Sequence, residues 1–222
     1  MSRVFILSPA SCAGQRARFL FNERATFTLA RSLHGPGGLS LGEAFAFMSG
    51  LYFRGKLTYA RAFASPPPGA PGVVIITPCD GLRRPDERVD VARLRRFAGV
   101  PIDAREPRYR DPLLRDAHAL GKAVGAHCEL VLLGSVASGK YVDLLGTVFG
   151  DRLRFPAEFV GRGDMSRGGL LLRCVAAQSE LQYVPVAGAA RHGPRPARLA
   201  PSPGIIKRSI ENDSVTIEET TS

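Results

Sequence analysis

The chain has no tryptophan, and only three methionines and four cysteines among its 222 residues. The cysteines are widely separated, and none forms a Cys-x-x-Cys pair or a Cys/His pair with metal-site spacing. No apolar run reaches about 18 residues, so no membrane span is predicted. The first residues lead directly into an apolar segment, without the cleavage pattern of a signal peptide. These absences favour a cytoplasmic protein with reduced thiols and predict no metal site.

Lysine is also scarce, although the chain is basic. Only four of the 30 basic residues are lysines, against 20 acidic residues, and the net charge is +10 with a pI near 10.1. A surface with this excess of positive charge attracts polyanions such as nucleic acid. The alternative is a basic protein without a specific anionic partner, since net charge alone does not define a function.

Short apolar runs alternate with helical patterns along most of the chain. Strands are predicted at 3–8, 72–77, 129–134 and 152–156, and helices at 40–64, 88–98, 113–126 and 139–149, with another starting near 164–166. The prolines at both ends of 107–112 predict a loop there. This alternation is typical of an α/β fold with three layers, in which helices flank a mostly parallel central sheet.

Composition changes sharply near the C-terminus. Residues 1–187 are predicted to form a single α/β domain. Residues 188–204 are rich in proline, glycine and arginine and predict a basic linker. Residues 205–222 are rich in Glu, Thr and Ser and predict a flexible tail.

The segment 134–140 has the pattern Gly-x-x-x-x-Gly-Lys between an apolar strand and a helix. It matches seven of the eight positions of a phosphate-binding P-loop, but Tyr141 stands where a Ser or Thr would bind Mg²⁺. Backbone N–H groups, the helix N-terminus and a lysine together suit a phosphate. The residues predicted to bind it are Gly134, Ser135, Ser138, Gly139 and Lys140. A true nucleotide-hydrolysing P-loop and a purely structural strand–helix turn are the alternatives.

The strand predicted at 72–77 is followed by Cys79 and Asp80. A carboxylate at a strand end is free to act as a general base, which makes Asp80 the first catalytic candidate. Cys79 is the second, as a nucleophile, provided that a nearby cation lowers its pKa. The alternative is an Asp-Gly turn beside a buried cysteine.

Ligands of open α/β sheets bind beyond the carboxyl ends of the strands, so the loops that follow the strands are expected to converge. Further polar residues of these loops, and of the helix that interleaves aromatics with cations near 52–63, are predicted to contact an anion or a nucleic acid. They are Ser11, Arg16, Arg54, Lys56, Arg162, Asp164 and Arg167. The alternatives are an amphipathic core helix with a solvated basic face, and Asp164 as a simple helix cap.

Four motifs together resemble a widespread bacterial α/β family of unassigned activity, over about residues 1–186. They are Ser8-Pro9-Ala10; Thr77-Pro78 with Gly81 and Pro85; Gly134-Ser135 with Gly139-Lys140; and Gly161-Arg162-Gly163-Asp164-Met165. Residues 72–186 are also faintly similar to the uracil-DNA-glycosylase-like domain of archaeosine synthase-type tRNA-modifying proteins. That similarity implies a nucleic-acid or nucleotide setting.

The sequence therefore predicts a protein that binds nucleic acid or a nucleotide, with chemistry at a nucleobase or an N-glycosidic bond as the first expectation for an enzyme. A nucleotide-dependent phosphotransferase with a degenerate P-loop is one alternative. A non-catalytic nucleic-acid-binding or interaction module is the other. No cofactor, oligomeric state or particular substrate is predicted, and whether the protein is an enzyme stays open.

Overall fold

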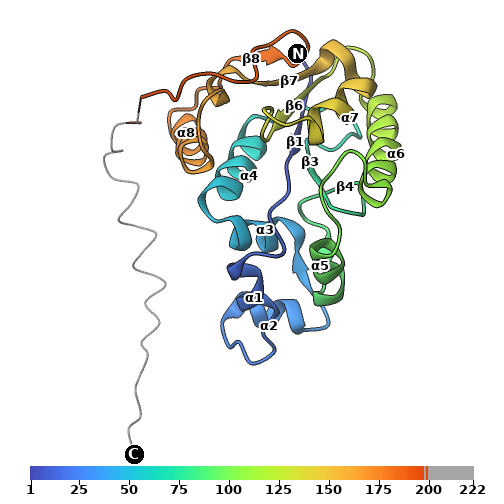
Figure 1. Cartoon of the computed structure of the whole chain (residues 1–222), viewed down its shortest axis with the longest axis vertical. Helices are drawn as coiled ribbons and strands as arrows, with labels where there is room; N and C mark the ends of the chain where they lie inside the picture. Colours follow the sequence, from blue (N-terminus) through green and yellow to red (C-terminus); the bar gives the residue numbers. More distant parts are fainter. Residues whose placement is uncertain (198, 200–222) are drawn as a thin grey trace, which may run out of the picture.

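A computed structural model describes residues 1–197 and 199. Its centre is a six-stranded sheet with the order β4-β3-β1-β6-β7-β8 (Figure 1). The four inner strands are parallel, and the two edge strands run antiparallel to their neighbours. The strands are β1 (Arg3–Leu7), β3 (Val73–Ile76), β4 (Leu82–Arg83), β6 (Glu129–Leu133), β7 (Leu153–Pro156) and β8 (Tyr183–Pro185).

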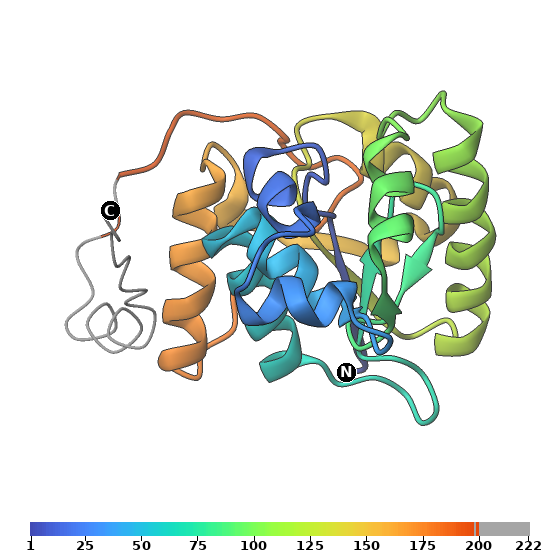
Figure 2. The ribbon, with the colours of Figure 1, turned by 90° about the horizontal axis from the view of Figure 1, so that it is seen from below.

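Helices cover both faces of this sheet, which gives the three layers that the sequence predicts (Figure 2). One face packs against α1 (Gln15–Phe21), α2 (Thr28–His34), α3 (Leu41–Ser49), α4 (Leu51–Phe63), α5 (Val91–Ala98) and α8 (Asp164–Ala176). The other face packs against α6 (Pro107–Val124) and α7 (Gly139–Phe149). A two-stranded antiparallel sheet of β2 (Leu39–Ser40) and β5 (Arg88–Val89) lies beside α3. Short 3₁₀ turns, η1 (Gly150–Arg152) and η2 (Ala157–Phe159), flank β7.

The side chains of the inner strands point alternately to the two faces of the sheet, so the hydrophobic core has two parts, one on each face. In β1, Phe5 and Leu7 face the layer of α4 and α8, whereas Val4 and Ile6 face α6 and α7. Successive side chains of a strand point to opposite faces, so a strand buried on both sides becomes a continuous apolar run. This is why β1, β3 and β6 are recognisable in the sequence.

The four predicted parallel strands are confirmed within one or two residues, as are the helices at 139–149 and from 164. The helix predicted at 88–98 begins only at Val91, because Arg88 and Val89 form β5 and Asp90 caps the helix. Two further predictions are wrong. The helix at 40–64 is two helices, because Gly50 has φ +63° and ψ −131° and ends α3 before α4 begins. The loop at 107–112 is the start of α6: Pro107 lies at the N-terminus, where its missing N–H removes no helical bond, and Pro112 lies inside the helix.

Within the described part of the predicted linker, residues 188–197 and 199 have no helix or strand. The remainder of that linker and the predicted tail lie outside the described residues. No helix in residues 1–197 is both long and apolar enough to cross a membrane.

Helices α4 and α8 pack closely against each other at two glycines. A Cβ atom on Gly55 would lie 2.7 Å from the carbonyl oxygen of Gly168, and one on Gly168 would lie 2.8 Å from the carbonyl oxygen of Leu51. The two backbones can approach this closely only because neither residue has a side chain. This contact fixes the position of α8, whose first turn contributes Asp164 to the site described below.

We therefore expect Gly168→Ala to lower the free energy of unfolding by about 1–3 kcal/mol, because the added methyl group collides with backbone that cannot rotate away. Denaturant unfolding measures this change. The matched control is Gly146→Ala in α7, where nothing lies within 4 Å of the new methyl group. In that variant the free energy of unfolding should rise by about 0.4–1 kcal/mol, since alanine favours the helix more than glycine does. Equal effects of the two substitutions would contradict the close packing.

Candidate functional site

A cavity of about 460 Å³ opens at the carboxyl ends of the parallel strands. From β1 the chain crosses to β3 on one side, and from β6 it crosses to β7 on the other, so the loops after β1 and β6 diverge. Divergent loops of this kind leave a crevice, the usual ligand site of open α/β sheets. The cavity is lined by residues 8–13 after β1, Pro78 after β3, Ser135, Lys140 and Tyr141 after β6, and Asp164 at the start of α8. All four loops that follow the parallel strands thus contribute to one cavity.

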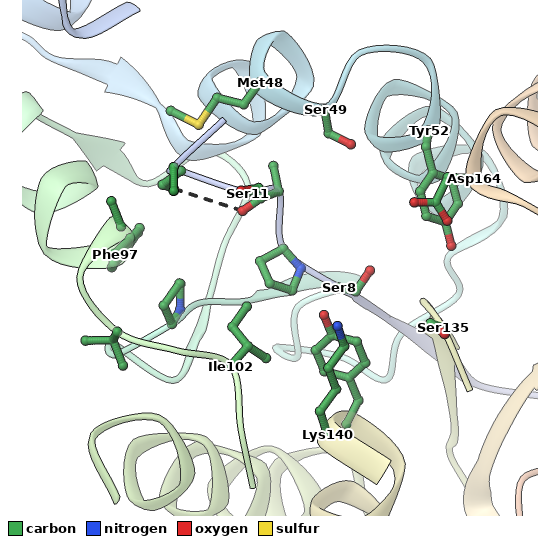
Figure 3. Close-up of a pocket in the computed structure, with 18 residues that line it drawn as sticks. Ser8, Ser11, Met48, Ser49, Tyr52, Phe97, Ile102, Ser135, Lys140 and Asp164 are labelled. Carbon is green, nitrogen blue, oxygen red and sulfur yellow. Dashed lines mark hydrogen bonds between the residues drawn. The ribbon is translucent and has the colours of Figure 1, made fainter. Parts of the chain in front are cut away.

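The cavity has a polar half and an apolar half (Figure 3). Lys140 and Asp164 lie in the polar half, near Ser8 and Ser135. The apolar half is formed by side chains of α3, α5 and the segment that follows α5: Met48, Phe97, Val100 and Ile102. Such a cavity suits an amphipathic ligand with an anionic group at one end and an apolar ring at the other.

The 134–140 loop connects β6 to α7, as predicted. The N-cap Ser138 makes no side-chain capping hydrogen bond, and Lys140 makes no ion pair among the described residues. The hydroxyl of Tyr109 donates a hydrogen bond of 3.0 Å to the Lys140 carbonyl and holds the start of α7 in place. The Lys140 ammonium is therefore not neutralised by an ion pair, whereas the carboxylate of Asp143 lies against Gly139 at the start of α7.

A buried lysine lies directly behind the polar half. Lys56 of α4 is 1% exposed, and its Nζ atom is 2.6 Å from the carbonyl oxygen and 2.8 Å from the Oγ atom of Ser8. The same nitrogen lies 4.6 Å and 4.8 Å from the ring centroids of Tyr52 and Phe53. Burial lowers the pKa of Lys56 to about 7; the nearby Asp164 raises it slightly and Arg167 lowers it further.

Tyr52 also lines the cavity. The side chain is 5% exposed, and its hydroxyl is buried with no hydrogen-bond partner among the described residues. Burial raises the pKa of Tyr52, so this hydroxyl keeps its proton and can donate it. The hydroxyl itself is closed off from the cavity and lies close to Arg167, whose charge opposes the effect of burial on the pKa of Tyr52.

The predicted catalytic pair lies outside the lining of the cavity. Asp80 is held by Arg93, with 2.6 Å between Oδ2 and Nε, and lies 3.7 Å from Arg96. Its backbone N–H donates to the hydroxyl of Thr77, which fixes the turn between β3 and β4. Burial and the charge of Asp80 raise the pKa of Cys79, the reverse of what a reactive thiolate needs. These contacts favour the structural alternative for both residues.

The predicted anion-binding residues are divided among three environments. Ser11 and Asp164 line the cavity, together with Ser135 and Lys140 of the loop. Lys56 and Arg167 are buried, at 1% and 7% exposure, so neither is placed to contact a nucleic acid on the surface as predicted. Arg167 donates to the carbonyl oxygen of Phe159 instead of facing solvent. The remaining three, Arg16, Arg54 and Arg162, lie outside the cavity lining.

The importance of Ser8 and Lys56 was missed by reasoning from the sequence. A signal for Lys56 is present, because it lies four residues after Tyr52 and three before Tyr59, on the apolar stripe of α4. A lysine on such a stripe either extends its nitrogen to solvent or buries it. Here α8 packs over α4, and the nitrogen is buried. The partner Ser8, 48 residues away in sequence, cannot be identified from periodicity.

The chain matches no protein-family model. No curated protein and no solved structure gives a significant match either. Within residues 1–197 and 199, no group of three or more His, Cys, Asp or Glu side chains is arranged to hold a metal ion. The function therefore has to be argued from the geometry of the cavity.

The lowered pKa of Lys56 predicts a pH-dependent stability. Between about pH 7 and 8.5, Lys56 is mostly a neutral amine in the folded protein but stays protonated in the unfolded chain. The unfolded state then binds more protons, so the free energy of unfolding should rise with pH by up to about 1.4 kcal/mol per unit. This contribution is lost as the pH falls through 7 and should be absent in Lys56→Met.

Denaturant unfolding at several pH values measures this slope for the wild type, for Lys56→Met and for Lys122→Met. Lys122 is exposed on α6, so its variant should keep the wild-type slope. A wild-type slope in Lys56→Met would show that Lys56 keeps an ordinary pKa.

Proposed function

We propose that this protein binds a nucleotide in the cavity between the loops after β1 and β6. The observation that carries the proposal is the division of a single cavity into a polar half, which holds Lys140 and Asp164, and an apolar half at Phe97 and Ile102. The nucleotide is either free or an unpaired residue of a nucleic acid. A net charge of +10 favours both forms by attracting polyanions.

The phosphate is assigned to the 134–140 loop. There the Lys140 ammonium, which makes no ion pair among the described residues, would act on it. Ser135 supplies a further donor on the adjoining wall. Charge-assisted hydrogen bonds of this kind are the strong contacts of phosphate sites.

The base is assigned to the apolar half. Phe97 and Met48 provide an aromatic ring and a polarisable side chain, and Ile102 closes the opposite wall. The volume of about 460 Å³ lies within the range of small-ligand sites, roughly 300–1,000 Å³. Stacking on an aromatic ring accepts any base, so the geometry supports the nucleotide class without selecting one base.

Tyr141 favours this binding site over a phosphotransferase of the P-loop type. Its side chain is 4% exposed and packs between the cavity and the core at the position where a P-loop has a hydroxyl for Mg²⁺. The predicted chemistry at a nucleobase or an N-glycosidic bond stays a proposal based on the resemblance. Asp80, the general base predicted for it, is tied to Arg93 and not directed into the cavity.

Removal of the Lys140 charge should weaken nucleotide binding about ten- to a hundredfold, the loss of one charge-assisted contact of about 1.5–3 kcal/mol. Calorimetric titration of nucleoside monophosphates into the wild type and Lys140→Ala measures this. Lys122→Ala on α6 is the matched control and should bind like the wild type. A wild type that binds no nucleotide at millimolar concentration would refute the proposal.

A second substitution tests the orientation of the ligand. Ile102→Glu places a carboxylate in the apolar half and should weaken nucleoside monophosphates strongly while leaving inorganic phosphate almost unaffected. Titration of short single-stranded oligonucleotides in the same buffers distinguishes a free nucleotide from a nucleic acid. If Ile102→Glu lowers the affinities for phosphate and for nucleotide equally, the base does not bind in the apolar half.

A further inference from the structure

Ser8 has a partner that the other serines of the cavity lack. Four serines line the cavity: Ser8, Ser11, Ser49 and Ser135. Of these only Ser8 contacts a lysine nitrogen, at 2.8 Å. A hydroxyl is a weak nucleophile until a base accepts its proton, and a lysine amine at hydrogen-bond distance is such a base.

We propose that Ser8 Oγ is a nucleophile and Lys56 Nζ its general base, and that the pair catalyses hydrolysis of a carboxylic ester bound in the cavity. This inference goes beyond nucleotide binding and does not require a nucleotide as ligand. Ser8 lines the cavity and Lys56 lies directly behind it, so the substrate reacts with the hydroxyl, and only groups bound at Ser8 Oγ come within reach of the amine.

The geometry around Lys56 suits a proton acceptor. A neutral amine has two N–H donors and one lone pair. One donor is satisfied by the Ser8 carbonyl oxygen at 2.6 Å, which fixes the nitrogen, and the lone pair can accept the Ser8 hydroxyl proton across 2.8 Å. The rings of Tyr52 and Phe53 enclose the side of the nitrogen that faces away from Ser8. The pKa of Lys56, lowered to about 7 by burial, leaves about half of the amine unprotonated at pH 7 and more at higher pH.

The charged groups around Lys56 are few. From α8, Asp164 raises its pKa and Arg167 lowers it. The strand β1 carries Arg3, which is ion-paired with Glu129 and Glu180, and β3 carries no charged residue. On α3 the carboxylate of Glu43 is engaged in the capping box of that helix. On α4 itself, Arg54 and Arg61 are exposed, and Tyr52 stays protonated because burial raises its pKa.

The reaction proceeds in two balanced steps. As Ser8 Oγ bonds to the ester carbonyl carbon, its proton passes to Lys56 Nζ and the carbonyl oxygen becomes an oxyanion. The oxyanion collapses, the bond to the alcohol oxygen breaks, and that oxygen leaves with the proton from Lys56. Water then attacks the acyl-serine, giving a proton to Lys56, and that proton returns to Ser8 Oγ as the acid leaves. Ser135 lines the cavity beside Ser8 and would donate to the oxyanion.

Phenylmethylsulfonyl fluoride tests the pair without a known substrate, because Ser8 Oγ would displace fluoride from its sulfur. Peptide mass spectrometry of the full-length wild type should find the sulfonyl group on Ser8 and not on Ser11, Ser49 or Ser135. The labelling rate should rise with pH through a midpoint near 7, since the neutral amine is the active form. Labelling at Ser8 should disappear in Ser8→Ala and fall at least tenfold in Lys56→Met.

An unmodified Ser8 in the wild type, equal labelling of the other cavity serines, or a rate without a midpoint near pH 7 would each overturn the proposal. The wild-type pH profile and site assignment stand even if Lys56→Met does not fold. A nucleoside monophosphate added as protectant separates the two proposals. If it does not slow the labelling of Ser8, that result argues against nucleotide binding in the cavity but leaves the proposal for Ser8 and Lys56 standing.

Discussion

The position of β1 at the centre of the sheet is the constraint on which the site depends. Because the chain first adds β3 on one side and later β6 and β7 on the other, the loops after β1 and β6 must diverge. The cavity is a consequence of that order and needs no special loop conformation. Helices α4 and α8, joined through Gly55 and Gly168, then close one wall of it.

The burial of Lys56 is the costly element of this arrangement. An ammonium group removed from water is unfavourable, and here the cost is limited by two contacts to Ser8, by two aromatic rings and by loss of the proton near pH 7. An apolar residue would fill the same volume without this cost. A lysine buried in α4 against a serine at the end of a central strand is the pattern expected when chemistry rather than packing determines the residue.

Much of the sheet could be predicted because its inner strands are buried on both faces and their apolar runs are continuous. The strand–loop–helix unit around 134–140 was recognisable for a related reason, since an apolar strand, glycines and a helix start follow one another closely in sequence. The errors have the same local origin. The sequence does not show that Gly50 has a positive φ angle, which ends α3. It also does not show that Pro107 lies in the first turn of a helix and not in a loop. Asp80 was chosen because it follows a strand, although Arg93, 13 residues later, neutralises it.

The sequence by itself therefore determined the α/β class, the buried strands and the cationic loop, because each of these depends on neighbours within a few residues. Only the tertiary structure decided that Ser11, Ser135, Lys140 and Asp164 share a cavity, that Asp80 does not line it, and that Lys56 is buried against Ser8. Those outcomes depend on strand order and on the contact between α4 and α8. Both are set by packing between segments far apart in the chain, about which local periodicity carries no information.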